Sequence, residues 1–200
     1  LWFIDEKNGF LVSNESLFRT SDGGEKWSKV NSIGGNYLNN IWFADSETGY
    51  IAGGWNGLEL YKTSDGGDSW EMVSAYQAYA ITGITTDPDN NQLYVTGNTS
   101  GLGSSSEPGQ VIMSAIGDGS TWNTISEIRS QNFYSIDFPG NNTGYVFGEY
   151  DAFKTNDNGL SWRKLNLGKE IRDAHFLDDQ HGFLVDYDSV YKTKDGGVTL

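Results

Sequence analysis

Short apolar runs alternate along this sequence with clusters of aspartate, asparagine and glycine. Aromatic and β-branched residues are common in the runs, as in segments 145–147 and 183–185, and the clusters between them are typical of tight turns. No persuasive stretch carries apolar residues at the 3.6-residue period of an amphipathic helix. The pattern therefore predicts an all-β protein made of short strands joined by tight turns.

One motif occurs four times. It consists of an aromatic residue, a basic residue and then Thr-x-Asp-x-Gly-x-x-Trp, and its copies begin at Phe18, Tyr61, Phe153 and Tyr191. In the last copy Leu200 stands where the others have tryptophan. Ahead of each copy lies a second shared pattern, an apolar run, an acidic or asparagine-rich turn and a glycine followed by an aromatic residue. Such self-similarity predicts a repeat architecture.

The repeats divide the chain into five units of about 40 residues, the size of a four-stranded propeller blade. The third unit is degenerate and ends near Asp118 and Trp122. The sequence therefore predicts a β-propeller domain over residues 1–200, with four-stranded antiparallel blades at approximately 1–34, 35–75, 76–128, 129–168 and 169–200. We expect these five units to be a segment of a six- to eight-bladed propeller. A complete five-bladed ring is the alternative.

The Thr-x-Asp-x-Gly-x-x-Trp motif has a mechanical explanation. Its aspartate can accept hydrogen bonds from backbone N–H groups across a tight turn, its glycine allows a positive φ, and its tryptophan anchors the next strand in the core. We do not expect calcium here, because each turn offers one dependable carboxylate and Ca²⁺ takes about 6–8 oxygen ligands. We also expect no other metal and no cofactor. The residues given this structural role are Thr20, Asp22, Gly24, Trp27, Thr63, Asp65, Gly67, Trp70, Asp118, Trp122, Thr155, Asp157, Gly159, Trp162, Thr193, Asp195 and Gly197.

The motif in residues 60–70 is similar to the Asp-box (BNR) repeats of bacterial sialidases, xyloglucan hydrolases and sortilin-type receptors. The fuller unit, with its Gly-aromatic pair upstream, most resembles the photosystem II assembly/stability factor-like propellers. The resemblance covers nearly the whole chain except the third unit. It implies the propeller fold and an exported protein, whether periplasmic, on the cell surface or secreted. It says little about function, because one fold hosts many activities.

The composition of the chain excludes some classes of binding partner. The formal net charge is −14, from 27 acidic and 13 basic residues, and a field of this sign repels the phosphates of nucleic acid. There are no cysteines, which excludes disulfides and thiolate metal sites. No segment approaches the roughly 20 apolar residues of a membrane-spanning helix, so we expect no membrane insertion. Proteins and carbohydrates are the partner classes that remain.

A binding site is expected on one particular rim of the propeller. The Asp boxes share a rim with the turns between the first and second strands, and the opposite rim carries loops that can vary without disturbing the blades. Two acid-aromatic-acid segments, 149–151 and 186–188, lie on that second rim. The ligand-binding candidates there are Trp55, Glu59, Tyr76, Tyr79, Arg129, Tyr150, Arg172 and Tyr187.

These residues favour a non-catalytic binding or assembly module that presents its rim to a protein or a glycan. The alternative is a glycoside hydrolase, sialidase-like or xyloglucan-hydrolase-like. A sialidase would need a three-arginine clamp, and Arg19 and Arg163 flank Asp boxes on the wrong rim. Hydrolysis by two carboxylates needs only a separation of roughly 5–9.5 Å. The catalytic candidates for that reaction are Glu149, Asp151, Asp186 and Asp188.

Overall fold

The chain forms a partial β-propeller, all-β as the sequence predicts. The computed structural model describes residues 1–30, 33, 37–54, 58–76, 80–98, 110–116, 121–128 and 132–200. In blades 1 and 2 the strands are β1 (Trp2–Phe3), β2 (Gly9–Ser13), β3 (Ser16–Thr20), β4 (Ser28–Val30), β5 (Leu38–Phe43), β6 (Gly49–Gly53), β7 (Leu58–Thr63) and β8 (Glu71–Tyr76). In blades 3 to 5 they are β9 (Ala80–Thr86), β10 (Leu93–Asn98), β11 (Gln110–Ile116), β12 (Thr121–Ile128), β13 (Phe133–Gly140), β14 (Thr143–Gly148), β15 (Ala152–Thr155), β16 (Arg163–Leu165), β17 (Asp173–Phe176), β18 (Gly182–Val185) and β19 (Val190–Thr193).

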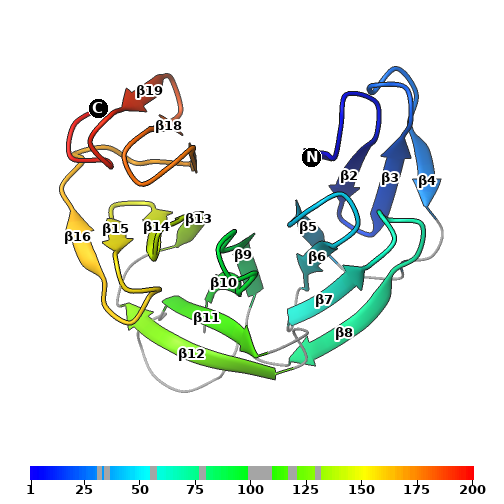
Figure 1. Cartoon of the computed structure of the whole chain (residues 1–200), viewed down its shortest axis with the longest axis horizontal. Coiled ribbons are helices and arrows are strands. Elements are labelled where there is room, and N and C mark those ends of the chain that lie inside the picture. Colours follow the sequence, from blue (N-terminus) through cyan, green and yellow to red (C-terminus); the bar gives the residue numbers. More distant parts are fainter. Residues whose placement is uncertain are drawn as a thin grey trace.

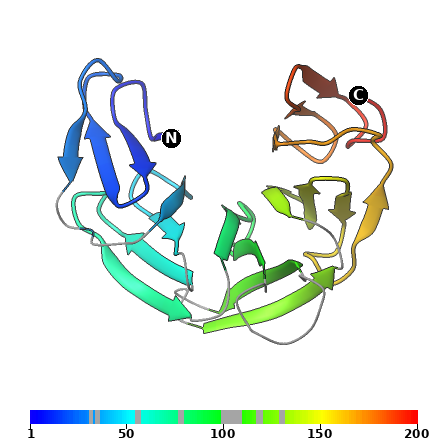
Figure 2. The same ribbon diagram turned by 180° about the vertical axis from the view of Figure 1, so that it is seen from behind.

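Each blade is an antiparallel sheet in which neighbouring strands follow one another in sequence. Blades 1 to 4 have four strands, and three strands of blade 5 are described. The blades follow one another around an arc, with the outer strands β4, β8, β12 and β16 on its periphery (Figure 1). Seen from behind, the same arc leaves an opening between the first and last blades (Figure 2). How many blades the propeller has in total stays a prediction.

The hydrophobic core is divided among the contacts between blades. Each of four clusters of buried side chains draws on two neighbouring blades. Between blades 4 and 5, for example, Tyr145, Phe147 and Leu165 pack with Phe176 and Leu184. Apolar residues must be buried to stabilise the fold, so each blade depends on its neighbours for most of its burial.

The second repeated pattern follows from one close contact inside blades 1, 2, 4 and 5. In each of them a phenylalanine near the end of the innermost strand lies directly against a glycine near the start of the second strand. A Cβ atom at Gly49 would lie 2.6 Å from the Phe43 ring, and one at Gly144 would lie 2.5 Å from the Phe138 ring. Real Cβ atoms do not approach so closely, so only glycine leaves room for the ring.

The aromatic residue after that glycine joins one blade to the next. The ring of Tyr145 in blade 4 stacks on Phe176 of blade 5 with centroids 3.7 Å apart. In blade 3 the equivalent residue is Tyr94, which follows Leu93 rather than a glycine, and it stacks on Phe138 at 3.9 Å. Phe10 stacks less closely on Phe43, at 5.3 Å. Aromatic pairs of this kind contribute about 0.5–1.5 kcal/mol beyond the area they bury. The Gly-aromatic pair therefore serves both the blade and its neighbour.

The four described Asp boxes share one set of hydrogen bonds. In the second box, the Thr63 hydroxyl donates to Asp65 Oδ1 (2.7 Å) and accepts from the Gly67 N–H (2.9 Å), while Asp65 Oδ1 accepts from the Ser69 N–H (2.9 Å). The boxes at Thr20, Thr155 and Thr193 repeat this arrangement. The bonded hydroxyl and N–H groups lower the pKa of Asp65 and of Asp195 to about 2.

The tryptophans of the boxes anchor the turns. The indole N–H groups of Trp27 and Trp162 donate to the carbonyl oxygens of Gly24 and Gly159 in their own boxes. Trp70 is buried and packs edge-on against Phe10 and Phe43. Each box glycine has the positive φ that its turn requires, as at Gly67 with φ 86°.

Each Asp box is also tied to the turn between the first and second strands of its blade. The residue after the aspartate donates its N–H to a carbonyl oxygen of that turn, in the pairs Gly23–Lys7, Gly66–Glu47, Asn158–Asn142 and Gly196–Gln180. The two kinds of turn therefore lie on the same rim, as the sequence predicts. The degenerate turn of the third unit, with Asp118, lies outside the described residues, as does the Trp122 side chain. The part of the chain that the structure describes contains no helix long and apolar enough to cross a membrane.

Replacing Thr63 with valine tests the Asp box. Thr63→Val keeps the shape of a fully buried side chain but leaves the Gly67 N–H and the Asp65 carboxylate without the hydroxyl. We expect the free energy of unfolding in urea to fall by about 1–3 kcal/mol. Thr63→Ser, which keeps the hydroxyl, should cost clearly less; equal losses in the two variants would contradict the role given to this hydrogen bond.

Gly144→Ala tests the contact between glycine and ring. The added Cβ meets Phe138 at 2.5 Å, and we expect a loss of about 1–3 kcal/mol in the free energy of unfolding. In a Phe138→Leu background the same substitution should cost less, because the smaller side chain relieves the overlap. A double-mutant cycle in urea measures the difference, and strictly additive losses would argue against the contact.

Candidate functional site

The rim of blades 4 and 5 opposite the Asp boxes carries two tight hairpins. In the first, between β14 and β15, the Gly148 N–H donates to the Asp151 carbonyl oxygen (2.8 Å). In the second, between β18 and β19, the Asp186 N–H donates to the Ser189 carbonyl oxygen (3.1 Å). The tips are therefore 149–150 and 187–188. The first acid-aromatic-acid segment begins one residue after the position that closes its hairpin, whereas the second begins at that position. The two segments are therefore offset by one residue and do not occupy equivalent positions of the repeat.

An arginine fixed between two tyrosines connects these blades. The guanidinium carbon of Arg172 lies 4.2 Å from the Tyr134 ring centroid and 4.0 Å from that of Tyr187. Its Nη2 forms an ion pair with Glu170 Oε1 at 2.6 Å, and the Tyr134 hydroxyl donates to the same oxygen at 3.4 Å. Cation–π contacts of this kind suit arginine in particular. The side chain of Tyr187 is thereby held on one face while the residue remains 70% exposed.

Glu149 and Tyr150 lie beside this group. Glu149 Oε2 accepts from Asn132 Nδ2 at 3.4 Å, which directs the carboxylate toward the inner strand of its blade. The charge and hydrogen bond of Glu149 raise the pKa of the Tyr150 hydroxyl. Tyr150 itself is 67% exposed. We call the surface formed by these residues the rim cluster: Tyr134, Glu149, Tyr150, Glu170, Arg172 and Tyr187.

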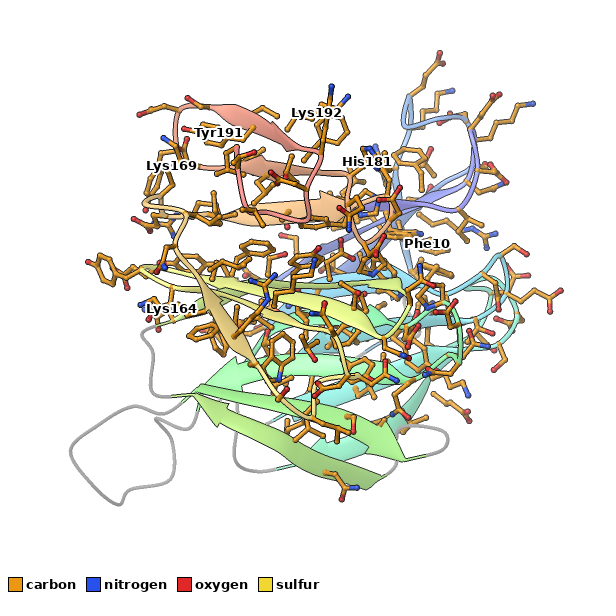
Figure 3. All side chains as sticks on the ribbon, turned by 60° about the vertical axis from the view of Figure 1, so that its left-hand side comes forward. Phe10, Lys164, Lys169, His181, Tyr191 and Lys192 are labelled. Atoms are coloured by element: carbon orange, nitrogen blue, oxygen red, sulfur yellow. The ribbon has the colours of Figure 1, made fainter. Side chains whose placement is uncertain are left out.

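Two of the four carboxylates proposed for catalysis are engaged within their own blades. Asp151 forms an ion pair with Lys164 on the outer strand β16. Asp186 accepts from the N–H groups of Asp188 and Ser189 and from the Tyr191 hydroxyl, and these bonds lower its pKa. Asp188 is exposed at the hairpin tip. Lys169 covers the Tyr191 ring at 4.6 Å, and the two side chains are seen together in Figure 3.

Of the other rim candidates, only Glu59 has a described side chain. Trp55, Tyr79 and Arg129 lie outside the described residues, and only the backbone of Tyr76 is described, at the end of β8. Glu59 is half-buried on β7, where Oε2 accepts from the Tyr61 hydroxyl at 3.5 Å. Among the described residues, no three histidine, aspartate or glutamate side chains are grouped so that they could hold a metal ion.

The sequence analysis missed a second feature, an inner cavity of about 440 Å³ lined by residues of the first, innermost strand of all five blades. Trp2 and Trp42 line it, and so do Asp137 and His175. These four side chains hold the same position in their blades, because each lies opposite the aromatic residue of the Gly-aromatic pair. Aligning the repeats on that aromatic residue would have revealed a carboxylate where two other blades have tryptophan.

Asp137 is a buried acid between blades 4 and 5. It is 4% exposed, and its Oδ2 accepts from the Phe176 N–H of the next blade at 2.6 Å. Burial raises the pKa of Asp137 to about 6, against the opposing effects of that hydrogen bond and of His175, whose Nδ1 lies 3.7 Å from Oδ2. Beside it, the Ser135 hydroxyl donates to Asp173 Oδ1 at 2.8 Å.

The raised pKa of Asp137 determines how the free energy of unfolding changes with pH. Between about pH 4 and pH 6 the folded protein binds more protons at Asp137 than the unfolded chain does, so this group makes the free energy of unfolding fall as pH rises. The Asp-box carboxylates with lowered pKa act in the opposite direction and below about pH 4.

Asp137→Asn tests this assignment. The amide oxygen can still accept from the Phe176 N–H but cannot ionise. In the wild type, Asp137 should lower the free energy of unfolding by on the order of 1–3 kcal/mol between pH 4 and pH 6.5. We expect this decrease to be absent in the variant, as measured by urea unfolding at each pH. Asp188→Asn, at an exposed site, is the matched control and should keep the wild-type profile. An unchanged profile in Asp137→Asn would refute the assignment.

The comparisons with known proteins agree with the resemblance inferred from the motif. Residues 1–77 match the family model described as photosynthesis system II assembly factor YCF48, and residues 74–103 match a model for a beta-propeller repeat. The resemblance to these propellers is therefore confirmed. Among curated proteins, no sequence matches this chain.

Solved structures of low sequence identity share the fold. The GH74 enzyme of Niastella koreensis is 16% identical with a TM-score of 0.67, over 96% of this chain and 35% of that one. YCF48 from Cyanidioschyzon merolae is 16% identical with a TM-score of 0.55, over 97% and 80%. A chain of a nidogen/laminin complex is 14% identical with a TM-score of 0.69, over 90% and 67%. This chain thus spans about a third of the GH74 enzyme.

Proposed function

We propose that the chain is a non-catalytic binding module that presents the rim cluster to a polypeptide partner. The observation that carries this proposal is the pair of exposed tyrosines, Tyr150 and Tyr187, beside an arginine already held between two rings. Tyrosine and arginine are enriched among the residues that dominate protein interfaces. Side chains fixed before binding lose little conformational entropy when a partner arrives.

The fold relatives are compatible with this function. YCF48 is described as an assembly factor, and the nidogen/laminin structure is a complex between proteins. The GH74 relatives are enzymes, and they keep hydrolysis open as an alternative. Of the four rim acids, however, Asp151 is paired with Lys164 and Asp186 supports its own hairpin. A two-carboxylate mechanism would have to use Glu149 and Asp188 or break these contacts.

The test compares capture of proteins from the source organism by the wild-type chain and by Tyr150→Ala/Tyr187→Ala. Each tyrosine is expected to contribute about tenfold to the affinity for the captured partner, so the double variant should lose most of it, as measured by titration calorimetry. Leu177→Ala is the control, because Leu177 is an exposed apolar residue on the opposite rim of the same blade.

A glycan array with product analysis runs in parallel. Cleavage of a bound glycan that is lost in Glu149→Gln would replace this proposal with the hydrolase. Equal affinity of the double variant and the wild type for a protein partner would show that the rim cluster is not the binding surface.

A further inference from the structure

One wall of the inner cavity is aromatic. Trp2 of blade 1 and Trp42 of blade 2 both line it, with ring centroids 4.4 Å apart and planes inclined by 55°. Both side chains are half-buried, and the Trp42 indole N–H is held by the Thr86 hydroxyl at 3.0 Å. Tryptophan faces attract cations more strongly than the faces of other aromatic residues.

Blades 4 and 5 contribute two carboxylates to the lining of the same cavity, Asp137 and Asp173. The donors that hold them are neutral. Asp137 accepts from the Phe176 N–H, and Asp173 accepts from the Ser135 hydroxyl and, at 2.9 Å, from the Ala174 N–H. Asp137 is buried, whereas Asp173 is exposed. A buried carboxylate such as that of Asp137 is costly without a compensating charge.

The cations near the cavity supply that charge only in part. Arg172 is held by Glu170 and by the two tyrosine rings. His175 lies 3.7 Å from Asp137, beyond hydrogen-bond distance, and its side chain is 63% exposed. Among the residues that the structure describes, no lysine or arginine is paired with Asp137 or Asp173.

We propose that the inner cavity binds a primary ammonium group between the Trp2–Trp42 pair and the carboxylates of Asp137 and Asp173. A free diamine or polyamine and a lysine side chain of a polypeptide share this chemistry. Anions are repelled by the two carboxylates and by the net charge of −14. A neutral sugar could stack on the tryptophans, but it would place no positive charge opposite the buried Asp137. The cavity shares Tyr134 and Arg172 with the rim cluster, but the proposed ammonium site uses neither residue and does not depend on the proposed rim function.

Fluorine NMR of the 5-fluorotryptophan-labelled chain tests the proposal directly. The chain has seven tryptophans, and titration with 1,5-diaminopentane should shift the resonances of Trp2 and Trp42. The resonances of Trp27 and Trp162 should stay in place, because these residues belong to Asp boxes on the outer part of the blades. The matched neutral probe 1,5-pentanediol should bind at least about tenfold more weakly, since charge-assisted hydrogen bonds are lost.

Variants then test which lining residues contribute to diamine binding. Asp137→Asn and Asp173→Asn should each weaken diamine binding roughly tenfold, whereas Asp188→Asn removes the same charge outside the cavity and should change it less than about twofold. Trp42→Phe should weaken binding by about threefold through the poorer cation–π partner. Unchanged Trp27 and Trp162 resonances report that each variant is folded.

The source of the ammonium group is decided by a second probe. If acetyl-Gly-Lys-Gly-amide shifts Trp2 and Trp42 in an Asp173-dependent way and the diamine does not, the ligand is a lysine side chain; the reverse result indicates a free amine. The same peptide with norleucine in place of lysine lacks the ammonium group and should not bind. The proposal is overturned if neither amine shifts these resonances, or if cellobiose shifts them equally in the wild type and in Asp173→Asn.

Discussion

The stacking of an aromatic ring of one blade on the phenylalanine of the next is the contact on which the rest of this structure depends. Tyr145 on Phe176 and Tyr94 on Phe138 close the spaces between blades, and the glycine before Tyr145 leaves room for Phe138 of its own blade. Because burial lies between the sheets, the blades must follow an arc, and their innermost strands must converge. The inner cavity is a consequence of that convergence.

Most of the fold could be predicted because the demands of this contact repeat in the sequence. Thr63, Asp65 and Gly67 act on one another within a few residues, so their spacing alone reports their geometry. The same is true of the glycine and the aromatic residue that follow the first turn in blades 1, 2, 4 and 5. Strands, turns and the shared rim of the Asp boxes could therefore be read from one repeat and checked in the others.

The site was predicted less well, because its contacts join blades rather than neighbours in sequence. Tyr150, Arg172 and Tyr187 were chosen as exposed rim residues, but Tyr134, which completes the stack on Arg172, lies in the inner strand of the preceding blade. The repeated acid-aromatic-acid segments suggested equivalent hairpins, and the strand register shows that they are offset by one residue. Asp137 was passed over because its burial depends on blade 5.

The positions where blades 4 and 5 depart from the repeat are the ones that carry candidate chemistry. At the inner-strand position where blades 1 and 2 place Trp2 and Trp42, blade 4 has Asp137 and blade 5 has His175. An apolar ring there would suit the packing, whereas a buried carboxylate is a cost to folding that the Phe176 N–H offsets only in part. A repeat protein that keeps such a residue in an otherwise regular strand sacrifices stability at one point, and sites of this kind are where function is expected. One position of the repeat therefore supplies both walls of the cavity, tryptophan from blades 1 and 2 and the buried carboxylate of Asp137 from blade 4.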